Sequence, residues 1–185
     1  MTDEAIKAVY DFWFVENGPK QWFTKDAAFD TAIRDRFEAL VEKAATGGLS
    51  HWRATARGAL AEIIVLDQFP RNLYRDDARA FASDPVGLVA AKEALEKKVD
   101  QEVSESERVF LYLPFEHSEA AEDQETSIRL CSSLADKSLL EWAEKHKAII
   151  DRFGRYLHRN AALGRVRPRR KNLNSSSRRG RHFSR

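Results

Sequence analysis

The stretch "LAEIIVLDQFPRN" runs from Leu60 to Asn72 and decides how this chain folds. Leu60 and Ile63 follow the three- and four-residue spacing of an apolar helix face, so the stretch belongs to a core helix. Pro70 lacks a backbone donor and disfavours helical geometry at the residue before it. The pattern therefore predicts a helix over Ser50–Phe69 that ends at the proline.

Helical periodicity dominates the rest of the chain, and no segment alternates like a convincing strand. Start signals such as "SDP" at 83–85 and the capping box "SESE" at 104–107 divide the chain into elements. About seven helices are predicted: from Thr2 or Asp3 to the turn "ENGP" at 16–19, then 25–45, 50–69, 84–99, 105–113, 118–134 and 138–157. Their short connections predict antiparallel hairpins, in a bundle or a short solenoid. We predict a single all-α domain over residues 1–165.

Composition excludes several classes of protein. The 185 residues suit one domain, and no apolar run approaches the roughly 18 residues of a membrane span. The N-terminus "MTDEAIKAVYDFWF" lacks the basic region of a secretory signal. Cys131 is the one cysteine, which excludes an internal disulfide and a thiolate metal cage. We expect a cytoplasmic protein with no cofactor, no bound metal and no membrane partner.

The net charge of +2 conceals two regions of opposite sign. Residues 166–185 carry 8 of the 31 Lys and Arg residues and no acid, which leaves 23 bases against 29 acids in residues 1–165. The body of the chain therefore has a net charge of −6, and the basic character lies in the tail. For this reason the pI of the whole chain does not indicate nucleic-acid binding.

A carboxylate is predicted on the buried face of the helix over 50–69. Asp67 follows Ile63 by four residues and Leu60 by seven. Burying a carboxylate is costly unless a cation or several donors lie nearby. Arg71 follows just beyond Pro70, and we expect the proline to redirect the chain so that acid and base converge.

Two further segments carry polar side chains near predicted helix ends. "PFEHSE" at 114–119 follows one predicted stop, with Ser118 as a natural N-cap and Glu119 in the first turn of the next helix. The last predicted helix carries a cationic ridge, spaced by three and four residues: Arg152, Arg155 and Arg159, joined by His158. We expect these segments and 67–72 to meet in one pocket.

The leading hypothesis is a binding module for a small anionic ligand or a peptide carboxylate. Arginines bind carboxylates and phosphates in a bidentate manner, and those expected to supply charge are Arg71, Arg155 and Arg159. The side chains expected to orient the guest are Asn72, Asn160 and Ser118.

Other interpretations of the same residues stay open. One alternative is a hydrolase-type enzyme, in which His117 or His158 acts as a general base held by Glu116 or Asp67. The pocket is purely structural if Asp67 and an arginine form a buried ion pair. A His–carboxylate metal site lacks the fixed spacing of a metal-binding helix and is not predicted. His146 lies on the apolar stripe of the last helix, where a core role is expected.

Several motifs resemble a known bacterial family. They are "FWF" at 12–14, "WF" at 22–23, "LDQFPRN" at 66–72, "LYLPFEHSE" at 111–119 and "RFGRYLHRNAALGR" at 152–165. Over residues 5–165 the chain resembles the bacterial domain of unknown function 924, which implies a tetratricopeptide-like all-α fold. By fold-level analogy such folds bind peptides in a concave groove. The family's characteristic polar positions correspond to Asp67, Gln68, Arg71, Asn72, Glu116, His117, Ser118, Glu119, Arg155, His158, Arg159 and Asn160.

The chain departs from the family pattern in two places. Leu157 replaces a proline, which predicts that the last helix continues. After "LGR" the family pattern has Ser-Thr-Pro-Glu-Glu, whereas this chain has "VRPRRKNLNSSSRRGRHFSR". Codons that permit this tail also permit Ser-Thr-Pro-Glu-Glu-Leu-Glu-Phe in a shifted frame, so we hypothesise a frameshifted C-terminus, which the nucleotide sequence of the gene decides. The alternative is a genuine basic tail that binds nucleic acid or anionic lipid, and in either case residues 166–185 are predicted to be disordered.

Overall fold

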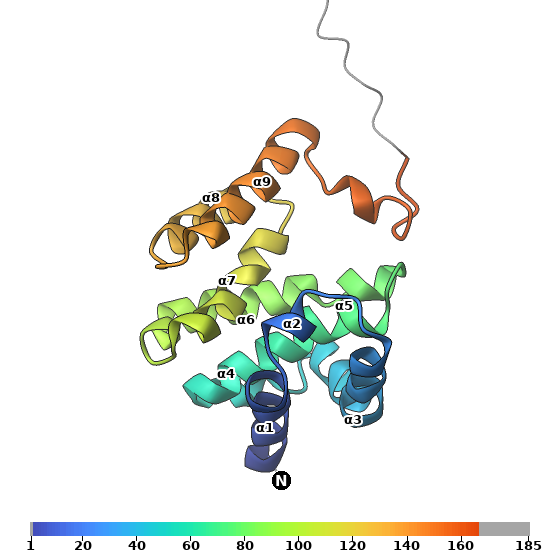
Figure 1. Cartoon of the computed structure of the whole chain (residues 1–185), viewed down its shortest axis with the longest axis vertical. Coiled ribbons are helices and arrows are strands. Elements are labelled where there is room, and N and C mark those ends of the chain that lie inside the picture. The colour runs from blue at the N-terminus through green and yellow to red at the C-terminus, as the bar shows by residue number, and fades with distance from the viewer. Residues whose placement is uncertain (1, 167–185) are drawn as a thin grey trace, which may run out of the picture.

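The computed structural model describes residues 2–166, which form helices and contain no strand (Figure 1). The all-α prediction is confirmed. The predicted tail, apart from Val166, and the hypothesis of a shifted reading frame concern residues outside this range. Among the described residues, no helix combines the length and the apolar character that crossing a membrane requires.

The helices are short to medium in length and are connected by brief turns. The α-helices are α1 Thr2–Asp11, α2 Pro19–Trp22, α3 Ala27–Ala45, α4 Ala56–Ile63, α5 Phe69–Leu73, α6 Asp84–Glu96, α7 Glu105–His117, α8 Ala121–Ser132 and α9 Lys137–Phe153. Two π-helical turns cover Phe12–Glu16 and Ile64–Gln68. Single 3-10 turns cover Ser50–Ala54, Ala78–Phe81, Val99–Gln101 and Leu157–Arg159. The third predicted helix thus divides into several pieces, and α2 begins at Pro19, the last residue of the predicted turn, in a stretch for which no helix was predicted.

The run from α4 through Ile64–Gln68 to α5 forms the centre of the core. Leu60, Ile63 and Leu66 have no exposed surface, and α4 packs against α1, α6 and α7. Phe69 continues the core, with its ring centroid 5.1 Å from that of Phe37. Each such side chain stabilises the fold by roughly 1.5–3 kcal/mol when it is buried. Hydrophobic burial therefore holds the central run in place.

The C-terminal half extends from this core and then returns to it. In Figure 1, α8 and α9 lie side by side as a hairpin that follows α7. After α9 the chain turns back, and the turn Leu157–Arg159 comes close to the start of α6, because Arg159 contacts Asp84. Residues as distant in the sequence as Lys25 and Arg159 thereby line a common cavity.

Pro70 does not end the helical run, contrary to the sequence prediction. It lies in the first turn of α5, directly after the π-helical turn Ile64–Gln68. A proline ring clashes with the carbonyl four residues earlier and cannot donate to it. Here that carbonyl belongs to Leu66, and it accepts a hydrogen bond from Ser83 Oγ at 2.7 Å. The wide turn and the serine together accommodate the proline.

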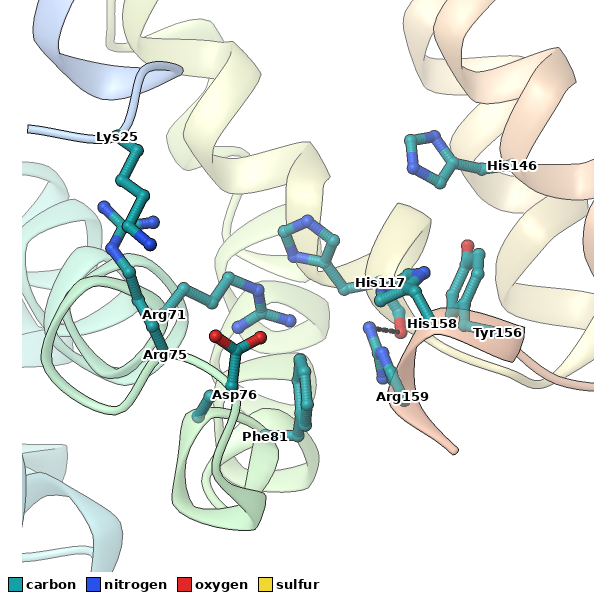
Figure 2. A pocket seen from close by; sticks show the side chains of 11 residues that line it. Lys25, Arg71, Arg75, Asp76, Phe81, His117, His146, Tyr156, His158 and Arg159 are labelled. Carbon is teal, nitrogen blue, oxygen red and sulfur yellow. Dashed lines mark hydrogen bonds between the residues drawn. The ribbon is translucent and has the colours of Figure 1, made fainter. Parts of the chain in front are cut away.

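Two predicted helix ends around residue 114 are also wrong. Pro114 lies inside α7, which continues to His117, so "PFEHSE" does not follow a helix stop. Ser118 does not cap α8, whose N-cap position is Ala120. Ser118 instead caps the end of α7, where its backbone N–H donates to Phe115 O. His117 therefore occupies the last turn of α7. Its side chain points toward the space between α7 and the C-terminal turn (Figure 2).

The predicted cationic ridge on the last helix does not exist as one helical face. Gly154, with φ of +67°, ends α9 in a left-handed conformation that glycine adopts without strain. Arg155 and Arg159 lie beyond this point, so they do not share a helix with Arg152. Leu157 likewise begins a separate 3-10 turn and does not extend α9.

Ser83→Ala is expected to destabilise the protein, because the buried Leu66 carbonyl loses its side-chain donor. The expected loss in the free energy of unfolding is about 1–3 kcal/mol. In a Pro70→Ala background, residue 70 again carries an N–H for that carbonyl, so the same change should cost less than about 1 kcal/mol. Urea denaturation of the unaltered protein, the two single variants and the double variant measures the loss in the free energy of unfolding in each background. Equal losses in the two backgrounds would contradict the role given to Ser83.

Candidate functional site

Asp67 lies at the centre of the polar site and is 1% exposed. His117 Nδ1 lies 2.8 Å from Asp67 Oδ1, and Gln68 Nε2 donates to Oδ2 at 2.7 Å. Arg71 Nη1 lies 3.3 Å from Oδ1. Burial alone would raise the pKa of Asp67, but the charges of Arg71 and His117 outweigh it and hold the pKa well below its ordinary value. The carboxylate is therefore ionised and compensated.

Asp84 joins two arginines from distant parts of the chain. Arg71 donates to both of its oxygens, at 2.8 and 3.0 Å, and Arg159 Nη1 donates to Oδ2 at 3.2 Å. Arg159 Nη2 also donates to the backbone oxygen of His117 at 2.9 Å. In the sequence Asp84 is recognisable only as part of the helix start signal at 83–85, because an Asp-Pro pair gives no sign of distant partners. The bridge fixes the C-terminal turn against α6 and α7.

Glu116 and His146 form a second carboxylate–imidazole pair. His146 Nδ1 lies 2.8 Å from Glu116 Oε1 and 3.0 Å from Trp142 O. The hydrogen bond that His146 donates to Glu116 raises the pKa of His146, against the effect of burial. The expectation of a core role for His146 is wrong, because its half-buried ring lines the open space in Figure 2. Its only sequence signal was a single polar residue in an apolar stripe.

In both pairs the Nδ1 atom faces an acceptor and therefore carries the hydrogen. Asp67 accepts from His117, and Glu116 accepts from His146. In the neutral ring this leaves Nε2 as a lone-pair acceptor, and no described residue forms a hydrogen bond with either Nε2 atom. The arrangement can bind a ligand hydrogen or accept a proton at two points.

Tyr156 secures the end of α7 from behind the site. Its hydroxyl donates to the backbone oxygen of Glu116 and accepts from Gln124 Nε2 at 3.0 Å. Gln124 Nε2 also reaches Glu116 O and Ser118 O, at 2.8 and 2.6 Å. Burial raises the pKa of Tyr156 to about 12, so the phenol stays protonated. These buried contacts hold the residues around His117 in a defined position.

Two adjoining cavities open beside these pairs. The smaller, of about 370 Å³, is lined by Lys25, Arg71, Arg75, Asp76, Ala80, Phe81, His117, His146, Tyr156, His158 and Arg159 (Figure 2). The larger, of about 810 Å³, shares five of these: Lys25, Arg71, Arg75, His117 and His146. Burial and the neighbouring Arg159 lower the pKa of His158. Volumes of this size suit small-molecule ligands.

Some predicted site residues serve neighbouring contacts and line neither cavity. Ser118 Oγ donates to Asp123 at 2.7 Å, and Glu119 accepts from the backbone N–H of Tyr156 and from Arg165. Arg155 forms no hydrogen bond or ion pair with any described residue.

The two predicted asparagines have different surroundings. Asn72 donates to Asp30 at 2.8 Å and lines the larger cavity. The buried side chain of Asn160 has no hydrogen-bond partner among the described residues.

The carboxylates and imidazoles do not assemble into a metal site. Glu116 pairs with His146, His117 pairs with Asp67, and Glu119 pairs with Arg165. Within residues 2–166, no group of three or more His, Cys, Asp or Glu side chains is arranged to hold a metal ion. Each carboxylate is instead directed at a partner within the protein.

The chain belongs to the DUF924 family of bacterial proteins of unknown function, whose sequence profile matches residues 9–171. It is also similar to a solved structure of a protein of unknown function from Agrobacterium tumefaciens. The two are 42% identical, with a TM-score of 0.86, over 90% of this chain and 93% of that chain. A search of curated proteins finds no match. The resemblance drawn from the motifs is confirmed.

His146 is expected to titrate above the ordinary value of 6.5 and His158 below it. Because the pKa of His146 is raised, its pairing with Glu116 stabilises the fold fully below pH 6.5, the ordinary pKa of histidine. This stabilisation is lost as the pH rises through the raised pKa of His146. Glu116→Gln should lower the pKa of His146 and change that of His158 less, because Glu116 acts on His158 only through the charge of His146. NMR titration of the ring protons measures both.

The exposed Glu125 supplies the control for this titration, since it pairs with Lys147 and lines neither cavity. Glu125→Gln should move neither histidine. Titration of His158 at a higher pH than His146 would contradict the geometry described.

Proposed function

We propose that the smaller cavity binds the carboxylate or phosphate group of a small molecule. The observation that carries this proposal is the chemistry of the lining. Seven of its eleven residues are Lys, Arg or His, and one, Asp76, is acidic. Charge-assisted hydrogen bonds from such groups are the strong ones in anion recognition.

Acidic residues behind the wall offset part of this positive charge. Asp84 pairs with Arg71 and Arg159, and Asp30 pairs with Arg75. The exposed side chain of Lys25, in contrast, forms no hydrogen bond or ion pair with any described residue. Lys25 and the histidine Nε2–H groups of the protonated rings are therefore the donors that a bound anion would use.

A purely structural ion-pair cluster explains only part of the site. Such a cluster accounts for Asp67, Asp84, Arg71 and Arg159, since these groups satisfy one another. It does not account for an open cavity with Lys25 at its edge. We therefore assign the ion pairs to the wall of the cavity and the remaining donors to its ligand.

Lys25→Gln is expected to weaken the binding of inorganic phosphate and acetate about two- to fivefold, because it removes one exposed charge from the cavity. Lys20→Gln is the matched control, since Lys20 is exposed nearby but lines neither cavity. Chemical-shift titration of both variants and the unaltered protein gives the affinities. Equal weakening by the two substitutions, or no binding by the unaltered protein, would refute the proposal.

A second candidate function is acid–base catalysis of hydrolysis by His117. The 2.8 Å contact between His117 Nδ1 and Asp67 favours it, because the carboxylate orients the ring and leaves Nε2 for a proton. In such a reaction His117 Nε2 would take a proton from water as the water oxygen attacks an ester carbonyl, and the imidazolium would return that proton to the alkoxide as the ester carbon–oxygen bond breaks, releasing acid and alcohol. Asp67 would stabilise the resulting imidazolium.

This candidate predicts that the protein hydrolyses p-nitrophenyl butanoate above the buffer rate. His117→Gln should then reduce the rate about 10²- to 10⁴-fold, the usual contribution of a general base. His51→Gln is the control, because His51 is exposed and lines neither cavity. A rate at the buffer level, or one unaffected by His117→Gln, removes this candidate.

A further inference from the structure

The larger cavity differs in chemistry from the smaller one that it adjoins. Most of its apolar lining comes from three parts of the chain: Trp22 and Phe23 around the end of α2, Val109 and Leu113 on α7, and Leu139 and Trp142 on α9. Cys131 and Leu134, from the end of α8, complete it. The positive residues that it shares with the smaller cavity lie at their junction. The combined space therefore has a basic part and an apolar part.

Two large aromatic side chains of this lining are exposed to solvent. Phe23 is 62% exposed and Trp142 is 56% exposed. Phe23 lies just after α2 and Trp142 lies on α9, yet both side chains line the same cavity. Exposed apolar surface that is gathered around a hollow marks a binding site more often than scattered single residues do.

We infer that the ligand is an amphipathic anion, with its carboxylate or phosphate in the smaller cavity and a hydrocarbon tail in the larger one. This inference rests on the proposed function and adds the class of molecule. We infer the tail because the two cavities are continuous: Lys25, Arg71 and His117 line both of them. An anion held by these residues therefore lies beside the apolar walls of the larger cavity. His158 and Arg159 line only the smaller cavity, whereas Phe23 and Trp142 line only the larger one, which favours the anionic group in the smaller cavity and the tail in the larger.

The dimensions favour a small molecule as the occupant. A cavity of about 810 Å³ lies within the range of roughly 300–1,000 Å³ found for small-molecule sites. Gln68, Arg71, Asn72 and Arg75 line it from one short segment, as expected where polar groups orient one end of a ligand, and Asp136 and Ser138 add polar groups at the start of α9. A second copy of the chain covering Phe23 and Trp142 is the competing occupant.

A ligand series tests the inference directly. Butanoate and octanoate differ by four methylene groups, each of which improves binding up to about fourfold when buried. Octanoate is expected to bind at least about tenfold more tightly than butanoate, and octyl phosphate should gain similarly over inorganic phosphate. Titrations can follow the indole signals of Trp22 and Trp142, which line the larger cavity.

Two variants locate the tail. Phe23→Ala and Trp142→Ala should each weaken octanoate about two- to tenfold while leaving butanoate within about twofold, since only the longer molecule reaches the aromatic rings. Val89→Ala is the control, because Val89 is 57% exposed on α6 and lines neither cavity. Thermal melting confirms that each variant remains folded.

The outcomes separate this inference from the function on which it rests. If butanoate and phosphate bind but the longer chains bind no more tightly, the tail is refuted and the anion site stands. If octanol binds as tightly as octanoate, the anion site itself is refuted. Dimerisation that is abolished by Trp142→Ala, without octanoate binding, would assign the apolar surface to a second copy and overturn the inference.

Discussion

A single buried carboxylate organises the interior of this protein. Asp67 lies on the central helical run, where burial of an isolated charge would be strongly unfavourable. Its partners come from different elements: Arg71 from α5 and His117 from the last turn of α7. The charge is tolerated only while these elements remain together, so one compensated ion links the core to the site.

The backbone around Pro70 makes this compensation geometrically accessible. A regular α-helix ending at the proline would leave Arg71 in an unrelated loop, whereas the π-helical turn lets the helical path continue. Arg71 then folds back over the turn and donates to Asp67 O at 2.5 Å as well as to Asp84. π-helical turns are rare and occur frequently at functional sites, in agreement with this position.

The site combines fixed and available polar groups. Asp84, Arg71 and Arg159 hold one another and bring the C-terminal turn onto α6. The imidazoles of His117 and His146 are anchored through Nδ1, which leaves Nε2 directed at ligand or solvent. Anchoring one side of each ring reduces the reorganisation required when a ligand or proton arrives. An apolar cavity beside such a group adds hydrophobic contact to charge recognition.

The amino-acid sequence by itself determined the helical class, the buried core face of Leu60 and Ile63, and the burial of Asp67, because these follow from periodicity along one element. It also predicted that the 67–72, 116–119 and 155–160 segments meet, and Asp67, His117 and Arg159 do so.

Only the tertiary structure decided which partners these residues take. Asp84 and His146 joined the site through contacts made by other helices, and Arg155 was excluded when Gly154 ended α9. The helix end expected at Pro70 was likewise overridden by a tertiary contact, that of Ser83 with the Leu66 carbonyl, and α7 continues through Pro114. Local spacing specifies which face of a helix is buried, but the neighbour that covers that face depends on how distant helices pack.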